Sequence, residues 1–242
     1  MAGRLIAMWS GPRNISTALM RSFGNRPDTD VVDEPLYGHY LAVTGIDHPG
    51  REEILASMPT DWRDVVAGLT RAPADGRIFY QKHMTHHVTP DVGLDWIVPL
   101  DNCFLLRDPE EVVRSYRAKR EGAAAADLGF EQQARIFDFV VTRTGRVPPV
   151  VDARDILENP RRTLSALCDA LRIDFREEML SWPAGRRDTD GVWARHWYDA
   201  VERSTGFAPY RPPEEPLDGT GRALANACRP FYEKLKAHGI GG

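Results

Sequence analysis

The sequence predicts an α/β fold of three layers, in which helices flank a central and mostly parallel sheet. Two observations support this expectation. Short apolar runs alternate along the chain with segments whose apolar residues recur at helical spacing, and the first apolar run leads through a tight loop straight into a helix. Unbroken apolar runs are typical of strands that are buried on both faces. We expect one domain over residues 1–242, with residues 202–242 forming an appendage of a Pro-rich loop and a C-terminal helix.

The composition excludes several classes of partner. The chain has 242 residues and a formal net charge of −4, with cations and anions scattered along it. The lack of a basic block argues against a nucleic-acid partner. No apolar stretch is long enough for a signal peptide or a membrane span, so we expect a cytoplasmic protein without a membrane partner. Cys103, Cys168 and Cys228 are far apart and lack metal-type spacing, which favours buried thiols in a reducing compartment.

The first element is a strand over residues 5–9, followed by a loop over residues 10–14 and a helix over residues 15–23. A strand–loop–helix unit aims backbone N–H groups and the positive end of a helix dipole into the loop, which makes an anion site. Arg13 adds a cation there, and Ser16 and Thr17 add hydroxyl groups. We therefore expect a phosphate-bearing ligand, with an ordinary Ser-capped turn as the alternative.

This loop does not match the P-loop consensus Gly-x-x-x-x-Gly-Lys-Ser/Thr, because no Gly-Lys pair precedes Ser16 or Thr17. The ligand need not be a nucleoside triphosphate with magnesium. A second strand is expected over residues 30–33, ending at Glu34. Residues 36–49 are rich in aromatic side chains and predict an irregular surface loop that shapes a pocket, although its tyrosines can equally serve packing.

The next strand, residues 78–81, is followed by Lys82 and by three histidines, His83, His86 and His87. Open α/β sheets bind ligands at the carboxyl ends of their strands. An imidazole there is suited to act as a general base near neutral pH. Zinc is the alternative, but no carboxylate or cysteine is close enough in the sequence to complete a ligand set, so we expect no metal.

A further strand, residues 101–106, ends at Arg107. Asp108 is the expected N-cap of the helix that follows, and Ser115 lies two turns into it. Arg107 therefore lies between a strand end and a helix start, where a second anion contact fits. The alternative is an ion pair of Arg107 with Asp108 or Glu111. Other expected elements are helices over residues 51–58, 61–69 and 131–144, a helix to about Lys119, a strand over 147–151, a helix from Pro160, helical residues 194–201, an exposed Pro-rich stretch over 207–216 and a C-terminal helix bent near Pro230.

Three separated segments resemble the sulfotransferases that use 3′-phosphoadenosine 5′-phosphosulfate (PAPS), which implies a three-layer P-loop-type fold. The first family motif, Pro-Lys-Ser-Gly-Thr-Thr, binds the 5′-phosphosulfate and is similar to residues 12–17, Pro-Arg-Asn-Ile-Ser-Thr. The resemblance implies that the co-substrate contacts Arg13, Asn14, Ile15, Ser16 and Thr17. Here Arg13 takes the place of the lysine, and Ile15 replaces a glycine.

The second family motif is an arginine at a strand end and a serine eight positions later, which hold the 3′-phosphate. Arg107 and Ser115 have this spacing. The third motif, Arg-Lys-Gly-x-x-Gly-Asp-Trp, resembles residues 186–193, so the resemblance implies that Arg186 and Arg187 also clamp the 3′-phosphate. Asp188 replaces the first glycine of that motif and brings a negative charge near this phosphate.

The resemblance implies transfer of a sulfuryl group from PAPS to a hydroxyl or amine of a small-molecule acceptor, without a metal and with release of adenosine 3′,5′-bisphosphate (PAP). The family carries Lys-Thr-His after a middle strand. Lys82 matches its lysine, and the base is displaced to His86 or His83, with Glu34 as the alternative base. Two other functions stay open: a P-loop-type kinase or nucleotide hydrolase, which would need magnesium, and a non-catalytic PAP-binding protein on a sulfotransferase framework.

Overall fold

The computed structural model describes residues 3–118 and 122–240, and these residues contain a five-stranded sheet. Its strands are all parallel, in the order β2-β3-β1-β4-β5. Their bounds are β1 Arg4–Ser10, β2 Thr29–Asp33, β3 Ile78–Met84, β4 Asp101–Leu106 and β5 Val150–Asp152. The predicted α/β fold with a parallel central sheet is confirmed.

Helices occupy most of the connections between the strands. The α-helices are α1 Ser16–Gly24, α2 Tyr37–Thr44, α3 Arg51–Ser57, α4 Trp62–Leu69, α5 Pro109–Arg117, α6 Phe130–Thr144, α7 Ala153–Glu158, α8 Pro160–Leu171, α9 Ala194–Trp197, α10 Asp199–Glu202 and α11 Gly219–Lys236. The described residues also include the 3₁₀ turns η1 Thr85–His87, η2 Asp95–Ile97, η3 Ala125–Leu128 and η4 Glu177–Leu180.

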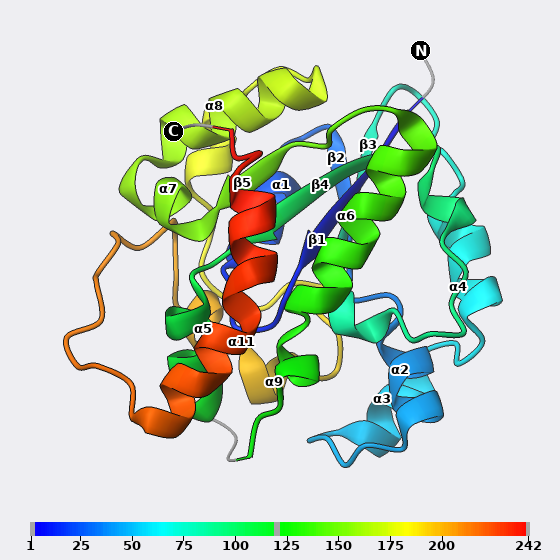
Figure 1. The fold of residues 1–242 in the computed structure, drawn as a ribbon. Helices are drawn as coiled ribbons and strands as arrows, with labels where there is room; N and C mark the ends of the chain where they lie inside the picture. Colours follow the sequence, from blue (N-terminus) through cyan, green and yellow to red (C-terminus); the bar gives the residue numbers. More distant parts are fainter. Residues whose placement is uncertain (1–2, 119–121, 241–242) are drawn as a thin grey trace.

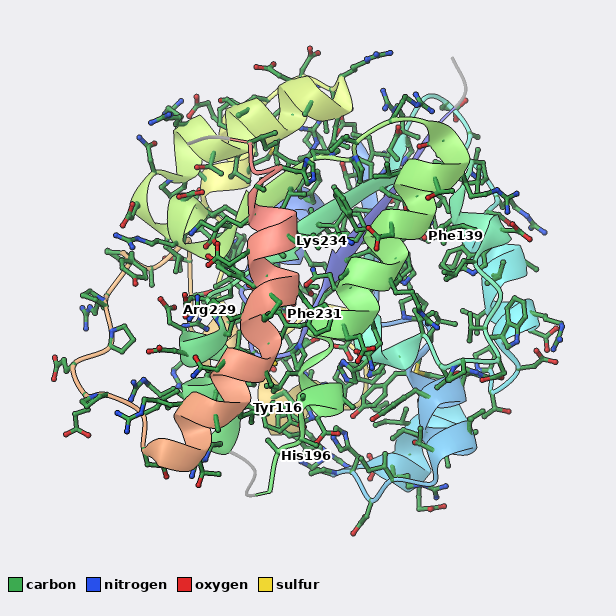
Figure 2. All side chains as sticks on the ribbon, in the orientation of Figure 1. Tyr116, Phe139, His196, Arg229, Phe231 and Lys234 are labelled. Carbon is green, nitrogen blue, oxygen red and sulfur yellow. The ribbon has the colours of Figure 1, made fainter. Side chains whose placement is uncertain are left out.

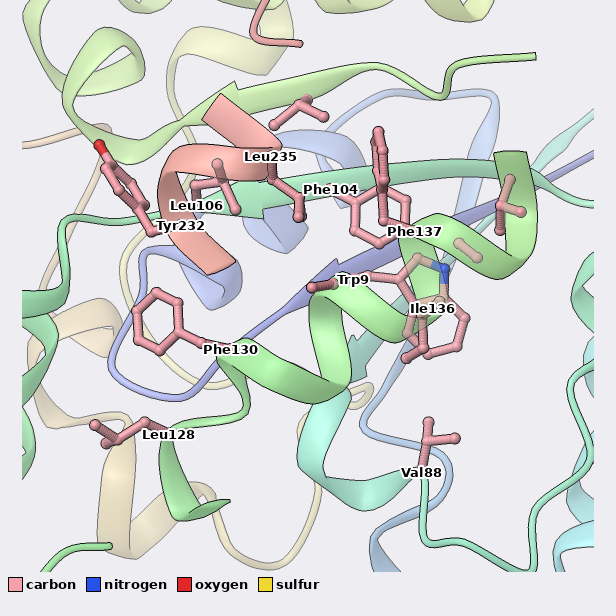
Figure 3. Packing of buried hydrophobic residues seen from close by; sticks show 14 of the residues in the cluster. Trp9, Val88, Phe104, Leu106, Leu128, Phe130, Ile136, Phe137, Tyr232 and Leu235 are labelled. Atoms are coloured by element: carbon pink, nitrogen blue, oxygen red, sulfur yellow. The ribbon is translucent and has the colours of Figure 1, made fainter. Parts of the chain in front are cut away.

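Side chains of β1 alternate between the two faces of the sheet, as a strand requires. Ile6 and Met8 pack with α1, α7 and α8, whereas Ala7 and Trp9 pack with α5, α6 and α11. Figure 1 shows α6 and α11 side by side across one face of the sheet, with α1 behind it, and buried residues of α1, α7 and α8 form the cluster on that other face. Figure 3 shows Trp9 and Phe104 from the strands packed against these two helices. The sheet is thus the buried middle layer of three.

The C-terminal helix α11 is part of a layer rather than an appendage. Its buried residues Cys228, Tyr232 and Leu235 belong to the same apolar cluster as Trp9 of the central strand. At its surface, Nζ of Lys234 lies 2.6 Å from Oδ2 of Asp138 on α6 (Figure 2). The apolar face of α11 can be buried only against the sheet and its neighbouring helices, which is why the expectation of an appendage is corrected.

Residues 36–49 are not the irregular surface loop that the sequence predicts. Most of this stretch forms α2, and Tyr37, Tyr40 and Leu41 are buried with Ile54 of α3 and Trp193 in a third apolar cluster. Because α2 has neighbours on several sides, its apolar residues do not fall on one stripe. The sequence therefore lacks the helical periodicity that reveals an amphipathic helix.

The predicted start of α5 is confirmed. Oδ1 of Asp108 accepts a hydrogen bond of 2.8 Å from the backbone N–H of Glu110, and Pro109 is the first helical residue. The helix ends at Arg117, and Lys119, to which it was expected to run, lies outside the described residues. Pro230 lies inside α11, which continues through it.

The three cysteines are buried and unpaired, as expected. Within residues 3–118 and 122–240, no helix combines the length and the apolar character needed to cross a membrane.

Candidate active site at the carboxyl edge of the sheet

A cavity of about 370 Å³ opens where the strands end. Its walls come from the loop after β1, from the ends of β2, β3 and β4, and from residues 193–208. Open α/β sheets bind ligands at this edge, and the volume is in the range of small-molecule sites. Ten predicted site residues line it: Arg13, Asn14, Ile15, Ser16, Thr17, Glu34, Lys82, His86, Arg107 and Ser115.

The loop after β1 is fixed by packing and hydrogen bonds. A Cβ atom at Gly11 would lie 2.6 Å from the carbonyl oxygen of Leu128, so only glycine fits there. Nδ2 of Asn14 donates to the carbonyl oxygen of Leu105 at 3.1 Å, and its Oδ1 accepts from the backbone N–H of Ile15 at 2.9 Å. Helix α1 then begins at Ser16 without a side-chain cap, beside the cavity, which is the kind of helix start that suits an anion.

The structure brings the two predicted anion contacts together. Nε of Arg13 donates to Oγ of Ser115 at 3.0 Å, and Nη1 of Arg107 donates to the backbone oxygen of Arg13 at 2.8 Å. Burial, and then the positive charge of Arg107, lower the pKa of the Arg13 guanidinium. In the part of the chain that the structure describes, no carboxylate pairs with Arg13, so a bound anion would supply the missing negative charge.

The alternative pairing of Arg107 with an acidic residue also occurs. Nε of Arg107 donates to Oε2 of Glu111, one helical turn later, at 2.9 Å. The carboxylate compensates the charge of Arg107 without removing the residue from the cavity wall. Arg107 is therefore held in place by Glu111 on one side and by the backbone of Arg13 on the other.

Lys82 lies at the centre of a buried polar network and is 1% exposed. Its Nζ is 2.7 Å from Oδ1 of Asp33, 2.6 Å from Oε1 of Glu34 and 2.8 Å from the hydroxyl of Tyr198. An ammonium group has three N–H donors, and all three are used here. Burial alone would lower the pKa of Lys82, but Asp33, Glu34 and Tyr198 outweigh it and raise this pKa well above its ordinary value.

Because its donors are used, Lys82 holds the network together and does not point a free charge at a ligand. The resemblance to the family implies a different role for Lys82, namely stabilising the charge on the transferred group and on the leaving phosphate oxygen. The sequence reasoning also missed Asp33 and Tyr198 as partners. Asp33 ends the strand beside Lys82, so the expected strand order could have revealed it as a partner. Nothing near Tyr198 in the sequence indicates its contact with Lys82.

Glu34 lines the cavity and has an uncommon backbone conformation for a non-glycine residue, with φ of 43°. Burial raises the pKa of its carboxyl group, Lys82 counteracts this, and Asp33 adds to the rise, so the net pKa lies above the ordinary value. Its second oxygen lies 4.0 Å from Nδ1 of His87. A carboxylate whose pKa is raised is better suited to take up a proton than an ordinary one.

His86 also lines the cavity. Burial, and then the neighbouring His48, lower the pKa of His86 to about 3, so its imidazole is neutral at physiological pH. His87 lines the same wall, stacked on Tyr37 with the ring centroids 4.5 Å apart.

The structure places His83 outside the cavity. Strand β3 continues to Met84, so Lys82 and Met84 face the cavity while His83 points to the other face of the sheet. There it stacks on Trp9 with a centroid distance of 4.3 Å, and its Nε2 lies 3.1 Å from Oε1 of Gln81. His83 is a core residue, and its expected position near the ligand is corrected.

Arg186 and Arg187 do not line the cavity either. Nη2 of Arg187 donates to the backbone oxygen of Pro183, and Nε of Arg186 is 3.9 Å from a carboxylate oxygen of Glu202. Their loop is held instead by Asp190, whose Oδ2 accepts from Arg21 of α1 in a fully buried ion pair of 2.7 Å. With their loop anchored there, the two arginines lie outside the cavity, and of the four residues expected at the 3′-phosphate only Arg107 and Ser115 line it.

The side chains in and around the cavity show no metal site. Among residues 3–118 and 122–240, no three His, Cys, Asp or Glu side chains are grouped so that they could hold a metal ion.

Comparison with known families matches the sequence of this chain to one of them. Residues 4–239 match the model of a family described as a sulfotransferase domain. The chain belongs to the sulfotransferase family. The resemblance that the three motifs suggested is therefore confirmed at the level of the family, and with it the assignment to a family of transferases.

Two Arabidopsis thaliana proteins resemble this sulfotransferase-family chain in sequence. They are named branched-chain-amino-acid aminotransferase-like proteins 2 and 1, and they are 32% and 34% identical to it over 234 residues. The match covers 97% of this chain and 42% of each relative, so the chain spans less than half of their length.

Solved structures share the fold of this sulfotransferase-family chain. The sulfotransferase domain from the curacin biosynthetic pathway has a TM-score of 0.54 at 16% identity, covering 94% of this chain and 98% of that one. A sulfotransferase from Alicyclobacillus acidocaldarius has a TM-score of 0.57 at 12% identity, covering 98% and 96%. At these identities the likeness concerns the fold alone.

Proposed function

We propose that this chain transfers a sulfuryl group from PAPS to a hydroxyl or amine of a small-molecule acceptor. The observation that carries the proposal is that the loop after β1, the Arg107–Ser115 wall and a carboxylate with a raised pKa, Glu34, meet in one cavity. The family match supports the reaction class, and the donor and the acceptor are inferred from the site.

In this proposal, two parts of the wall bind the two charged ends of the donor. The N–H groups at the start of α1, together with Arg13, hold the 5′-phosphosulfate. Arg107 and Ser115 hold the 3′-phosphate, which ATP lacks. Because Arg13 donates to Ser115, and Arg107 donates to the backbone of Arg13, the two subsites share one hydrogen-bond network.

Glu34 is the base that the geometry favours. A pKa of about 3 makes His86 a weak base at neutral pH, whereas the pKa of Glu34 is raised. In the transfer step, a bond forms between the acceptor atom and sulfur while the bond from sulfur to the phosphate oxygen breaks. The carboxylate of Glu34 takes the acceptor's proton, and PAP leaves with the electron pair of the broken bond. Arg13 and the N–H groups of the loop stabilise the charge that develops on the leaving phosphate.

The acceptor is expected to present an apolar or aromatic surface. The wall away from the anion site carries Tyr37, Tyr40, Trp193 and Trp197. Buried, unpaired cysteines favour a reducing compartment, which is consistent with the proposed cytoplasmic location.

Calorimetric titration with PAP, compared with ATP plus magnesium, tests the proposal. We expect tight binding of PAP, weak binding of ATP and loss of PAP binding in Arg107→Ala. Arg63→Ala is a matched control, because its side chain is 71% exposed and lies outside the cavity. A preference for ATP with magnesium would refute the proposal in favour of a kinase or nucleotide hydrolase. PAP binding without consumption of PAPS over a broad panel of acceptors would favour a non-catalytic PAP-binding protein.

A further inference from the structure

Tyr210 lies in the Pro-rich stretch that the function described above does not use. Its hydroxyl donates to Oε1 of Glu111 at 2.8 Å. The other oxygen of that carboxylate accepts from Nε of Arg107 at 2.9 Å. Tyr210, more than ninety positions further along the chain, thus contacts Glu111, the ion-pair partner of Arg107 in the cavity wall.

The segment that carries Tyr210 also forms part of the cavity. Gly206, Phe207 and Ala208 line it directly. This stretch is anchored by a bridge between Ser181 and Gly206 and by the ring of Phe207, which meets Trp182 edge-on at 5.1 Å. The segment is therefore fixed beside the cavity two residues before Tyr210.

The ring of Tyr210 is held from its other side. The guanidinium carbon of Arg154 lies 4.9 Å from the centre of this ring. A second cavity of about 290 Å³, behind the Arg107–Glu111 pair, is lined by Tyr210, Arg154 and Glu111. Without the hydroxyl of Tyr210, Oε1 of Glu111 would face this space with no other hydrogen-bond donor in the described residues.

We propose that Tyr210 is a positioning residue for the 3′-phosphate subsite, acting through Glu111 on Arg107. The inference rests on the proposed function, because it needs a ligand with a 3′-phosphate. Tyr210 fixes one oxygen of the Glu111 carboxylate, so the other oxygen holds the guanidinium group of Arg107 in one orientation through Nε. Nη1 of Arg107 is held by the backbone of Arg13, which leaves its Nη2 without a partner among residues 3–118 and 122–240 and available to a phosphate oxygen.

This arrangement predicts a larger effect on the 3′-phosphate than on the 5′-phosphate. Tyr210 reaches the 3′-phosphate subsite through Glu111 and Arg107, whereas it reaches the 5′-phosphate subsite only through the further hydrogen bond from Arg107 to the backbone of Arg13. Loss of the hydroxyl should therefore weaken binding of PAP more than binding of adenosine 5′-phosphate (AMP). Hydrogen bonds to charged groups are among the stronger ones in proteins, and only part of this bond's free energy reaches the ligand, so we expect a loss of about three- to tenfold in the PAP/AMP affinity ratio.

The test is calorimetry with PAP and AMP on the wild-type chain and on Tyr210→Phe, Glu111→Gln, the double variant and Tyr232→Phe. Tyr232→Phe is the matched control, because it also removes one phenol hydroxyl, which donates to Asp152 at 2.7 Å. We expect Tyr210→Phe to lower the PAP/AMP ratio, the control to keep it, and the double variant to equal Glu111→Gln.

Three results would overturn the inference. An unchanged ratio in Tyr210→Phe, or an equal loss of affinity for both ligands, would show that Tyr210 does not act on the 3′-phosphate. Additive losses in the double variant would show that Tyr210 does not act through Glu111. A wild-type chain that binds PAP no better than AMP would refute the proposed function itself. If the wild-type chain prefers PAP to AMP and Tyr210→Phe leaves that preference unchanged, only the role of Tyr210 is refuted.

Discussion

The buried network around Lys82 allows a prediction that needs no ligand. Lys82 and Asp33 are each 1% exposed in their side chains, and Glu34 is 12% exposed. Lys82→Met removes the cation and keeps most of the side-chain volume, so the loss of packing is small. Two carboxylates then stay in the interior without the ammonium group that compensates them. Removing one partner of a buried ion pair typically costs about 3–5 kcal/mol, and we expect a loss of that size.

Urea unfolding of the wild-type chain, Lys82→Met, Asp33→Asn and the double variant measures this loss. Since the double variant leaves fewer uncompensated charges, we expect it to recover most of the free energy of unfolding, to within about 1–2 kcal/mol of the wild type. The cost of Lys82→Met should also depend on pH. Lys82 counteracts the raised pKa of Glu34, so this pKa rises further in the variant. A raised carboxyl pKa penalises the folded state at high pH, and the penalty decreases as the pH falls through that pKa.

The reasoning would be refuted by a loss below about 1 kcal/mol for Lys82→Met at neutral pH, because the network would then contribute no more than a surface pair. A double variant as unstable as Lys82→Met alone would show that the cost does not come from the uncompensated carboxylate of Asp33.

Three further predictions follow from the site. Glu34→Gln should lower the rate of sulfuryl transfer by about 10²–10⁴-fold, and the wild-type rate should rise with pH through the raised pKa of Glu34; a variant within threefold of the wild type would exclude Glu34 as the base. Arg21→Met should cost about 3–5 kcal/mol in urea unfolding, because Asp190 is left buried and unpaired, and a loss under about 1 kcal/mol would contradict this. Gly11→Ala should cost about 1–3 kcal/mol, since its Cβ would meet the oxygen of Leu128 at 2.6 Å; unchanged thermal unfolding would contradict this.

The sequence could predict those parts that depend on local chemistry. The first strand and its loop, the capped start of α5 at Asp108, and the spacing of Arg107 and Ser115 are local patterns, and each lies where it was expected. Such features follow from a few neighbouring residues, because N-caps and loop geometry are set within one or two turns.

Other parts depend on contacts that the sequence does not show. His83 was expected near the ligand because the strand was expected to end at residue 81. The strand continues for three more residues, and its alternating side chains put His83 on the face away from the cavity. The surface position of Arg186 follows from the ion pair between Arg21 and Asp190, which lie 169 positions apart. The Lys82 network needs Tyr198, which reaches the sheet from the distant junction between α9 and α10.

Strand β1 lies at the centre of the sheet, with parallel partners on both sides. Its amide protons should therefore exchange with solvent last, since opening them requires the whole sheet to unfold. The loop that follows β1 is attached to this strand, so we expect it to be rigid as well. The opposite wall, residues 204–208, has no regular secondary structure beyond one bridge. Release of a ligand through that wall would need only the Ser181–Gly206 bridge and the Phe207–Trp182 contact to open, so substitutions there can change the residence time of the ligand without changing the stability of the sheet.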